Sequence, residues 1–156
     1  MDIMQQQKYA FIGLGHLGAN LAGSLLRGGF DVIVHDHDVG AMQRLAGLGA
    51  KTVTSAAEAA RHAGNAITCL PPPTVSELVL AGPGGLLEGL PQGGTWIEMS
   101  TNGRDEILRL AALAASKGIN TLECPVTGGV HRAAAGEITA LVGGDAGLAD
   151  RFADGA

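Results

Sequence analysis

Three glycines near the N-terminus have the spacing that a phosphate-binding turn needs. Gly13, Gly15 and Gly18 form a G-x-G-x-x-G motif directly after the apolar run 9–12, and leucines at helical spacing follow it. In such a turn the first glycine allows a sharp bend, the second lets the backbone approach the phosphates, and the third lets the helix pack close to its strand. The helix N-terminus, with its unpaired N–H groups, would then face the anion. The motif predicts a pyrophosphate site at Gly13, Leu14, Gly15, His16, Leu17 and Gly18.

An acidic residue follows the motif at the distance expected of a ribose-binding carboxylate. Asp36 closes the next apolar run, 30–35, and lies 18 positions after Gly18. A carboxylate there binds the ribose hydroxyls of NAD and repels the 2′-phosphate of NADP, so NAD is favoured. Two alternatives stay open: a glycine-rich turn without a ligand, in a chain with 25 glycines, and a solvated turn at Asp36 and Asp38. We interpret Asp38 as the cap of the next helix and Asp36 as the ribose ligand.

Length and composition indicate a compact globular domain. The 156 residues are 46% hydrophobic and 16% charged, with a net charge of −5, so we expect a packed core. The sequence has no basic cluster or aromatic platform, which argues against a nucleic-acid partner. No apolar run approaches the ~20 residues of a membrane span. Residues 1–7 have no signal core and are expected to be a short disordered tail on a cytoplasmic protein.

The cysteines and histidines form no pattern typical of a metal site or a nucleophile. Cys69 and Cys124 each end an apolar run, so we expect buried thiols that act as small hydrophobes, rather than a disulfide. The five histidines lack ligand spacing, and the pair His35-x-His37 alone does not make a site. We therefore predict no metal.

Strand-like apolar runs alternate with helical segments along the whole chain. This alternation predicts a mostly parallel sheet wound on both faces, an α/β fold of the Rossmann type, in one dinucleotide-binding domain over residues 8–156. Thr54 and Ser55 can cap the third helix. We expect strands at 8–12, 30–35, 51–53, 66–70, 95–99, 119–123 and 138–142, and helices at 16–27, 39–48, 56–62, 74–80 and 104–116.

The fold predicts where a ligand binds. In open α/β sheets ligands lie beyond the carboxyl ends of the strands, near the point where the strand order reverses. This edge would bring together the glycine turn, Asp36, Leu70-Pro71, Ser100-Thr101 and the loop from Pro125 onward.

That loop carries a further motif. The run from Glu123 to Gly129 reads E-C-P-V-T-G-G. Together with the glycine turn, Leu70-Pro71 and Ser100-Thr101, it resembles the β-hydroxyacid dehydrogenases of the 3-hydroxyisobutyrate dehydrogenase type, whose members carry D-x-P-V-S-G-G. The resemblance covers about residues 8–144, in the order of the family. Thr127 and Glu123 replace the usual serine and aspartate, and the added methyl group of Thr127 is expected to shift substrate choice.

The resemblance implies an NAD-dependent oxidoreductase of small β-hydroxy acids. Leu70 and Pro71 would hold the dinucleotide with the glycine turn, and Thr101 would lie near the nicotinamide. A hydroxyl beside successive glycine N–H groups forms a concavity for an anion, such as a substrate carboxylate. The alternative is a tight turn without a ligand. The substrate would be bound by Ser100, Thr127, Gly128 and Gly129.

The proton donor of the family is a lysine on a long helix beyond the dinucleotide domain, and we expect it beyond Ala156. Lys8, Lys51 and Lys117 each precede an expected strand, so they would lie at the amino edge, opposite the cofactor. His131 follows the substrate loop, but its position alone does not assign a catalytic role. We expect these residues to be the cofactor domain of a longer enzyme, whose helical domain supplies the lysine and the interface of a homo-oligomer.

Two other functions stay open. A non-catalytic dinucleotide-binding module would share the glycine turn and need no proton donor. An imine reductase would share the architecture, but the anion concavity of the 125–129 loop suits a carboxylate substrate better.

Overall fold

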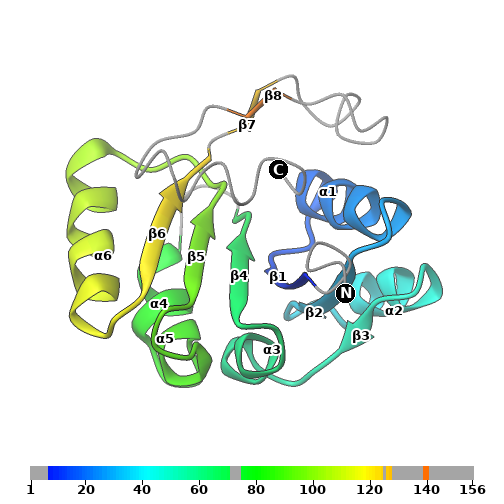
Figure 1. Cartoon of the computed structure of the whole chain (residues 1–156). Coiled ribbons are helices and arrows are strands. Elements are labelled where there is room, and N and C mark those ends of the chain that lie inside the picture. The colour runs from blue at the N-terminus through cyan, green and yellow to red at the C-terminus, as the bar shows by residue number, and fades with distance from the viewer. Residues whose placement is uncertain (1–6, 71–74, 125, 128–138, 141–156) are drawn as a thin grey trace.

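The computed structural model describes residues 7–70, 75–124, 126–127 and 139–140. Six parallel strands form one sheet in the order β3-β2-β1-β4-β5-β6 (Figure 1). The order reverses between β1 and β4, which is the switch point of a doubly wound sheet. The predicted Rossmann-type fold is therefore confirmed. The strands are β1 (Lys8–Ile12), β2 (Asp31–His35), β3 (Lys51–Thr52), β4 (Asn65–Thr68), β5 (Thr95–Glu98) and β6 (Asn120–Glu123).

Helices cover both faces of the sheet because neighbouring residues of each strand point to opposite sides. Tyr9 and Phe11 of β1 belong to the core cluster of α1 and α2, whereas Ala10 and Ile12 belong to that of the other four helices. Figure 1 shows α1 and α2 together beside β1 and β2, and α6 beside β6. The helices are α1 (His16–Arg27), α2 (Val39–Gly47), α3 (Ala56–Ala63), α4 (Ser76–Ala81), α5 (Leu86–Gly89) and α6 (Arg104–Ser116).

Hydrogen bonds of local side chains fix two helix starts. The Ser55 hydroxyl accepts from the backbone N–H of Glu58, and the Thr54 hydroxyl donates to the Glu58 carboxylate. This reciprocal arrangement is a form of capping box. The hydrogen bond from Thr54 also lowers the pKa of the Glu58 carboxyl. Asp38 accepts from the backbone N–H of Ala41 and caps α2, which confirms the interpretation of Asp38.

Three features differ from the expected elements. β4 ends at Thr68, so Leu70 follows the strand instead of belonging to it. The four-residue α5 was not predicted, because its length is too short for helical periodicity. The strand expected at 138–142 is seen as β8 (Thr139–Ala140), which pairs antiparallel with β7 (Val126–Thr127) in a separate sheet. A strand pattern alone does not determine its pairing partner.

Several predictions fall partly outside the described residues. Gln7, placed in the N-terminal tail, accepts a hydrogen bond from the Tyr9 hydroxyl, while residues 1–6 lie outside. None of the helices in the described ranges is long and apolar enough to span a membrane. Across the same ranges, no three histidine, cysteine or acidic side chains gather as a metal site would require.

Candidate dinucleotide site

The glycine turn connects β1 to α1, and two of its glycines are required by close packing. Gly13 has a φ of +99°, in the left-handed region that favours glycine, and a Cβ on it would lie 2.9 Å from the carbonyl carbon of Cys69. A Cβ on Gly18 would lie 3.0 Å from the Gly13 carbonyl carbon and closer still to its oxygen. Gly13 and Gly18 therefore let the turn, the start of α1 and the segment after β4 meet at backbone distance.

Gly15 differs, because no neighbour requires a glycine there. Its φ of −66° suits any residue, and a Cβ built on it would meet no atom of the described residues within 4 Å. Gly15 is exposed and is the N-cap of α1, so the open space lies at the helix start. A pyrophosphate needs this space to reach the backbone N–H groups. A side chain at position 15 would fill this space. We call the turn from Gly13 to Gly18, with its open space at Gly15, the dinucleotide cradle.

The electrostatics of α1 also suit an anion. Of the six helices in the described ranges, α1 alone has neither a capping side chain nor an acidic residue in its first turn. The other five each carry a carboxylate at one of these positions, which partly offsets the positive end of the helix dipole. The N-terminus of α1 keeps that positive end, and no side chain of the described residues accepts from its first N–H groups. Both properties favour a bound phosphate.

Asp36 follows β2 and lies directly against the glycine turn. Its Oδ2 accepts a 2.6 Å hydrogen bond from the backbone N–H of Leu14, and its Oδ1 accepts a 2.8 Å bond from that of Asp38. A carboxylate offers about four acceptor sites, so about two remain for ribose hydroxyls. Asp36 therefore fixes the turn and keeps the capacity to bind a ribose.

The predicted residues after β4 and β5 meet at the same edge. Ser100 is 4% exposed, and its hydroxyl accepts a 2.7 Å hydrogen bond from the backbone N–H of Leu70. Thr101 beside it is exposed. Ser100 thus joins the two segments, while its contact with a substrate and that of Thr101 with the nicotinamide stay predictions. Pro71 lies outside the described residues.

Sequence reasoning missed Glu98, the last residue of β5. Its side chain is fully buried at this edge and accepts hydrogen bonds from four neighbouring groups. The signal that could have found it is an acid inside the run Trp96-Ile97-Glu98-Met99, since acids are almost never fully buried unless their oxygens are bonded.

The predicted substrate loop is described only in part. Thr127 lies in β7 and pairs with Thr139 of β8, so it belongs to a short strand. Gly128, Gly129 and His131 lie outside the described residues. The roles of Thr127, Gly128 and Gly129 in binding a substrate stay predictions.

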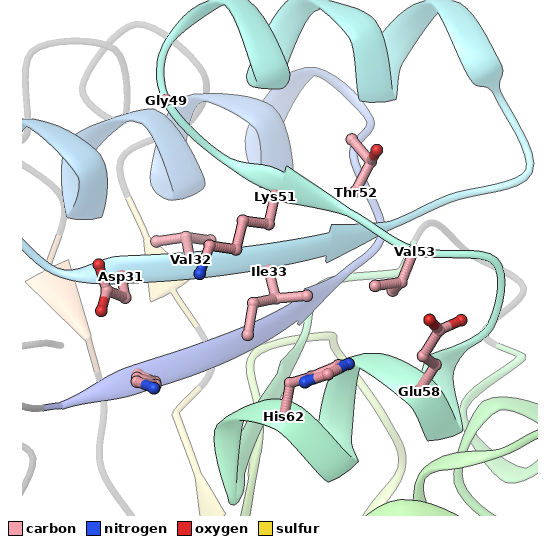
Figure 2. Close-up of a pocket in the computed structure, with 10 residues that line it drawn as sticks. Asp31, Val32, Ile33, Gly49, Lys51, Thr52, Val53, Glu58 and His62 are labelled. Atoms are coloured by element: carbon pink, nitrogen blue, oxygen red, sulfur yellow. The ribbon is translucent and has the colours of Figure 1, made fainter.

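The lysines lie at the edge opposite the glycine turn. Lys8 and Lys51 are the first residues of β1 and β3, and Lys117 precedes β6, so all three occupy the amino edge of the parallel sheet. A cavity of about 530 Å³ opens at this edge, lined by Lys8 and Lys51 and by residues such as Asp31 and His62 (Figure 2). This cavity is separate from the dinucleotide cradle.

The two cysteines are buried thiols, as predicted. Burial raises the pKa of the Cys69 thiol to about 11, with a further contribution from the Glu98 carboxylate. Burial likewise raises the pKa of Cys124. Because the thiolate is the reactive form, neither residue suits a nucleophilic role near neutral pH.

Comparison with known proteins shows the family to which this chain belongs. A family model described as the NAD binding domain of 6-phosphogluconate dehydrogenase matches residues 8–154. The chain belongs to this family. The β-hydroxyacid dehydrogenase resemblance is confirmed, because relatives of this NAD-binding domain include 3-hydroxyisobutyrate dehydrogenases and related enzymes.

Relatives of this NAD-binding domain are named as dehydrogenases. The NAD-dependent L-serine dehydrogenase of Pseudomonas aeruginosa is 37% identical over 140 residues, covering 90% of this chain and 47% of the relative. The solved 3-hydroxyisobutyrate dehydrogenase of Mycobacterium tuberculosis with L-serine matches with a TM-score of 0.86 at 33% identity, over 94% of this chain and 49% of that one. The chain spans about half the length of the curated dehydrogenases it matches.

Other matches bear on the cofactor and the alternative functions. Psf3, solved in complex with NADP+ and 2-OPP, matches with a TM-score of 0.87 at 29% identity, over 93% of this chain and 51% of that one. An imine reductase of Streptomyces aurantiacus shares the fold at 20% identity, with a TM-score of 0.84 over 96% of this chain and 51% of that one. The human cytokine-like nuclear factor N-PAC is 30% identical over 142 residues, covering 91% of this chain and 26% of the factor.

Proposed function

We propose that this chain forms the NAD-binding half of a dehydrogenase of small β-hydroxy acids. The observation that carries the proposal is the open space at Gly15, at the one helix start in the described ranges without a capping or first-turn acid. The substrate class is inferred from relatives named for L-serine and 3-hydroxyisobutyrate.

Most of the predicted residues have a separate role in this proposal, and His16 and Leu17 belong to the same turn as the three glycines. Gly13, Gly15 and Gly18 hold the pyrophosphate, and Asp36 binds the ribose with the acceptor sites that Leu14 and Asp38 leave free. NAD, when bound, supplies the acceptor for the hydride of the carbinol carbon. The nicotinamide half would be held by Leu70, Pro71 and Thr101, and the substrate by Ser100, Thr127, Gly128 and Gly129.

The chain by itself is expected to bind NADH but to oxidise 3-hydroxyisobutyrate, glycerate or L-serine very slowly. Its three lysines lie at the amino edge, so none can serve as the acid or base beside the nicotinamide. Calorimetric titration with NADH and the appearance of NADH absorbance test the two parts separately.

Four outcomes discriminate between the functions. Failure to bind NADH contradicts the proposed function. Robust oxidation of any of the three acids contradicts the slow turnover that we expect from the positions of the three lysines. Reduction of cyclic imines would favour an imine reductase. Binding without turnover of any of these substrates, in this chain and in any longer natural form of it, would favour a non-catalytic dinucleotide-binding module.

Replacing Asp36 is expected to narrow the preference for NAD over NADP by about tenfold. The wild-type carboxylate binds ribose hydroxyls and repels a 2′-phosphate. The repulsion vanishes in both Asp36→Asn and Asp36→Ala, and the bonds to the ribose vanish in Asp36→Ala. The ratio of the dissociation constants of NADPH and NADH is the quantity to measure. Asp36→Asn keeps one carbonyl oxygen for the turn, so it separates the cofactor effect from the loss of the Leu14 contact.

Asp38→Asn is the matched control for Asp36. It removes a negative charge two residues away, and asparagine caps helices as well as aspartate does. An effect of overall charge alone would change the ratio equally in Asp38→Asn and Asp36→Asn. An unchanged ratio in both Asp36 variants would show that Asp36 does not choose the cofactor.

A further inference from the structure

A buried carboxylate joins the end of β4, the start of α4 and the segment after β5 at the carboxyl edge of the sheet. Both oxygens of Glu98 accept two hydrogen bonds each. Oε1 accepts from the Thr68 hydroxyl at 2.7 Å and from the Ser100 backbone N–H at 2.9 Å. Oε2 accepts from the Ser76 hydroxyl at 2.5 Å and from the Asn102 amide at 3.1 Å. All four acceptor sites of the carboxylate are thus used by neutral donors.

The network extends beyond its first partners. The indole N–H of Trp96 donates to the Thr68 hydroxyl at 2.9 Å, so that hydroxyl accepts from Trp96 and donates to Glu98. Ser100 receives the Leu70 backbone N–H on its hydroxyl while its own N–H is held by Glu98. A fixed chain of bonds therefore runs from Glu98 through Ser100 to Leu70.

The network lies beneath one half of the proposed cofactor site. In a doubly wound sheet the two halves each bind one mononucleotide, so β1 to β3 serve the adenosine half and β4 to β6 the nicotinamide half. The glycine turn and Asp36 belong to the first half. Every group bonded to Glu98 lies at the end of β4 or in the segments after β4 and β5, on the second half.

We propose that Glu98 is a positioning residue for the nicotinamide half of the cofactor, acting through Ser100 and Asn102 on the segments that carry Leu70 and Thr101. Its side chain is 0% exposed, so it reaches no ligand itself. The inference rests on the proposed NAD-binding function. Glu98 holds the backbone of the two segments in one arrangement before the cofactor binds.

Replacing Glu98 by methionine tests this role. Glu98→Met keeps an unbranched side chain of similar length but offers no oxygen to the Ser100 N–H or to the Thr68 hydroxyl. Losing such bonds should weaken NADH binding by about tenfold or more. ADP-ribose, which lacks the nicotinamide, should bind within about twofold of the wild type. Titration calorimetry with both ligands gives the ratio of the NADH affinity to the ADP-ribose affinity.

The conservative variant Glu98→Gln should restore most of the NADH affinity. Its amide oxygen can keep the Thr68 and Ser100 bonds. Its amide nitrogen can donate to the Asn102 Oδ1, a buried oxygen without a partner in the described residues, once the Asn102 amide turns over. Rescue by glutamine supports positioning by hydrogen bonds. Equal losses in Glu98→Gln and Glu98→Met would contradict it and assign the effect to charge.

Two further variants separate a loss of positioning from a general loss of stability. Ile97→Val, on the other face of the same strand, should lower the melting temperature without changing the ratio of NADH to ADP-ribose affinity. If Glu98→Met does not fold, Ser100→Ala removes the acceptor of Leu70 and should give the same NADH-selective loss.

Parallel weakening of both ligands in Glu98→Met and Ser100→Ala, or no weakening in either, would overturn the positioning role alone. A wild-type chain that binds neither ligand would overturn the proposed function, and this inference with it.

Discussion

Gly15→Ala is expected to weaken NAD binding on the order of 100-fold, or about 2.7 kcal/mol, with little change in the fold. The added methyl group would occupy the space at the start of α1, where a Cβ would meet no atom of the described part of the chain within 4 Å. A pyrophosphate could then no longer approach the N–H groups of the turn. Because the φ of −66° suits alanine, the backbone is not strained. Titration with NADH and with ADP-ribose should show the same loss, since both carry the pyrophosphate.

Two glycines provide controls for Gly15→Ala. Gly103 is the N-cap of α6, with the same φ of −66° and open space around it. Gly103→Ala should therefore reproduce the loss of stability that alanine causes at an N-cap, which is about 1 kcal/mol. Gly47, also in open space at the end of α2, lies far along the chain from the turn, and Gly47→Ala should not affect binding. Wild-type affinity in Gly15→Ala would mean that the pyrophosphate does not lie at this turn.

Gly18→Ala is expected to damage the fold itself. A Cβ there would lie 3.0 Å from the Gly13 carbonyl carbon and closer to its oxygen, and both are backbone atoms that cannot rotate away. The start of α1 must therefore move away from β1. We expect this to lower the free energy of unfolding by about 3 kcal/mol, at the upper end of the range for overpacking. At about 2–4 °C per kcal/mol, the melting temperature should fall by roughly 6–12 °C. Calorimetry or circular dichroism measures this.

Gly23→Ala in the same helix should act in the opposite direction. Its Cβ would meet only the end of the Arg27 side chain at 3.4 Å and Leu48 at 3.8 Å, and alanine is a better helix former by about 1 kcal/mol. If Gly18→Ala were as harmless as Gly23→Ala, the close contact between α1 and the turn would be wrong.

Much of the dinucleotide cradle could be predicted because it is local. The glycine turn, its strand and its helix lie within one stretch of chain, so their spacing directly encodes which position must bend, which must stay open and which must pack closely. The structure adds the physical reason at each position, with a left-handed Gly13, an unobstructed Gly15 and a crowded Gly18. The apolar alternation of strands and helices likewise predicted the sheet.

The second half of the site could not be predicted in the same way. Glu98 is bonded to residues 68, 76, 100 and 102, two of which lie 22 and 30 positions away in the chain. No spacing rule links these residues, because they meet only when β4, α4 and β5 pack side by side. The buried role of Ser100 and the pairing of β7 with β8 depend on such contacts too.

Asp36 combines a feature that the sequence predicts with a contact that only the tertiary structure shows. The sequence alone determined that an acid stands after the second strand, at the distance of a ribose ligand. Only the tertiary structure showed that this acid also accepts the Leu14 N–H, 22 positions away, and so braces the turn. The spacing of nearby residues shows where the backbone needs a glycine. The partner of a hydrogen-bonding side chain is decided only when folding brings distant segments together. For this chain, local spacing determined the fold and the glycine turn. The long-range hydrogen bonds decided how the sheet edge beneath the nicotinamide half is held.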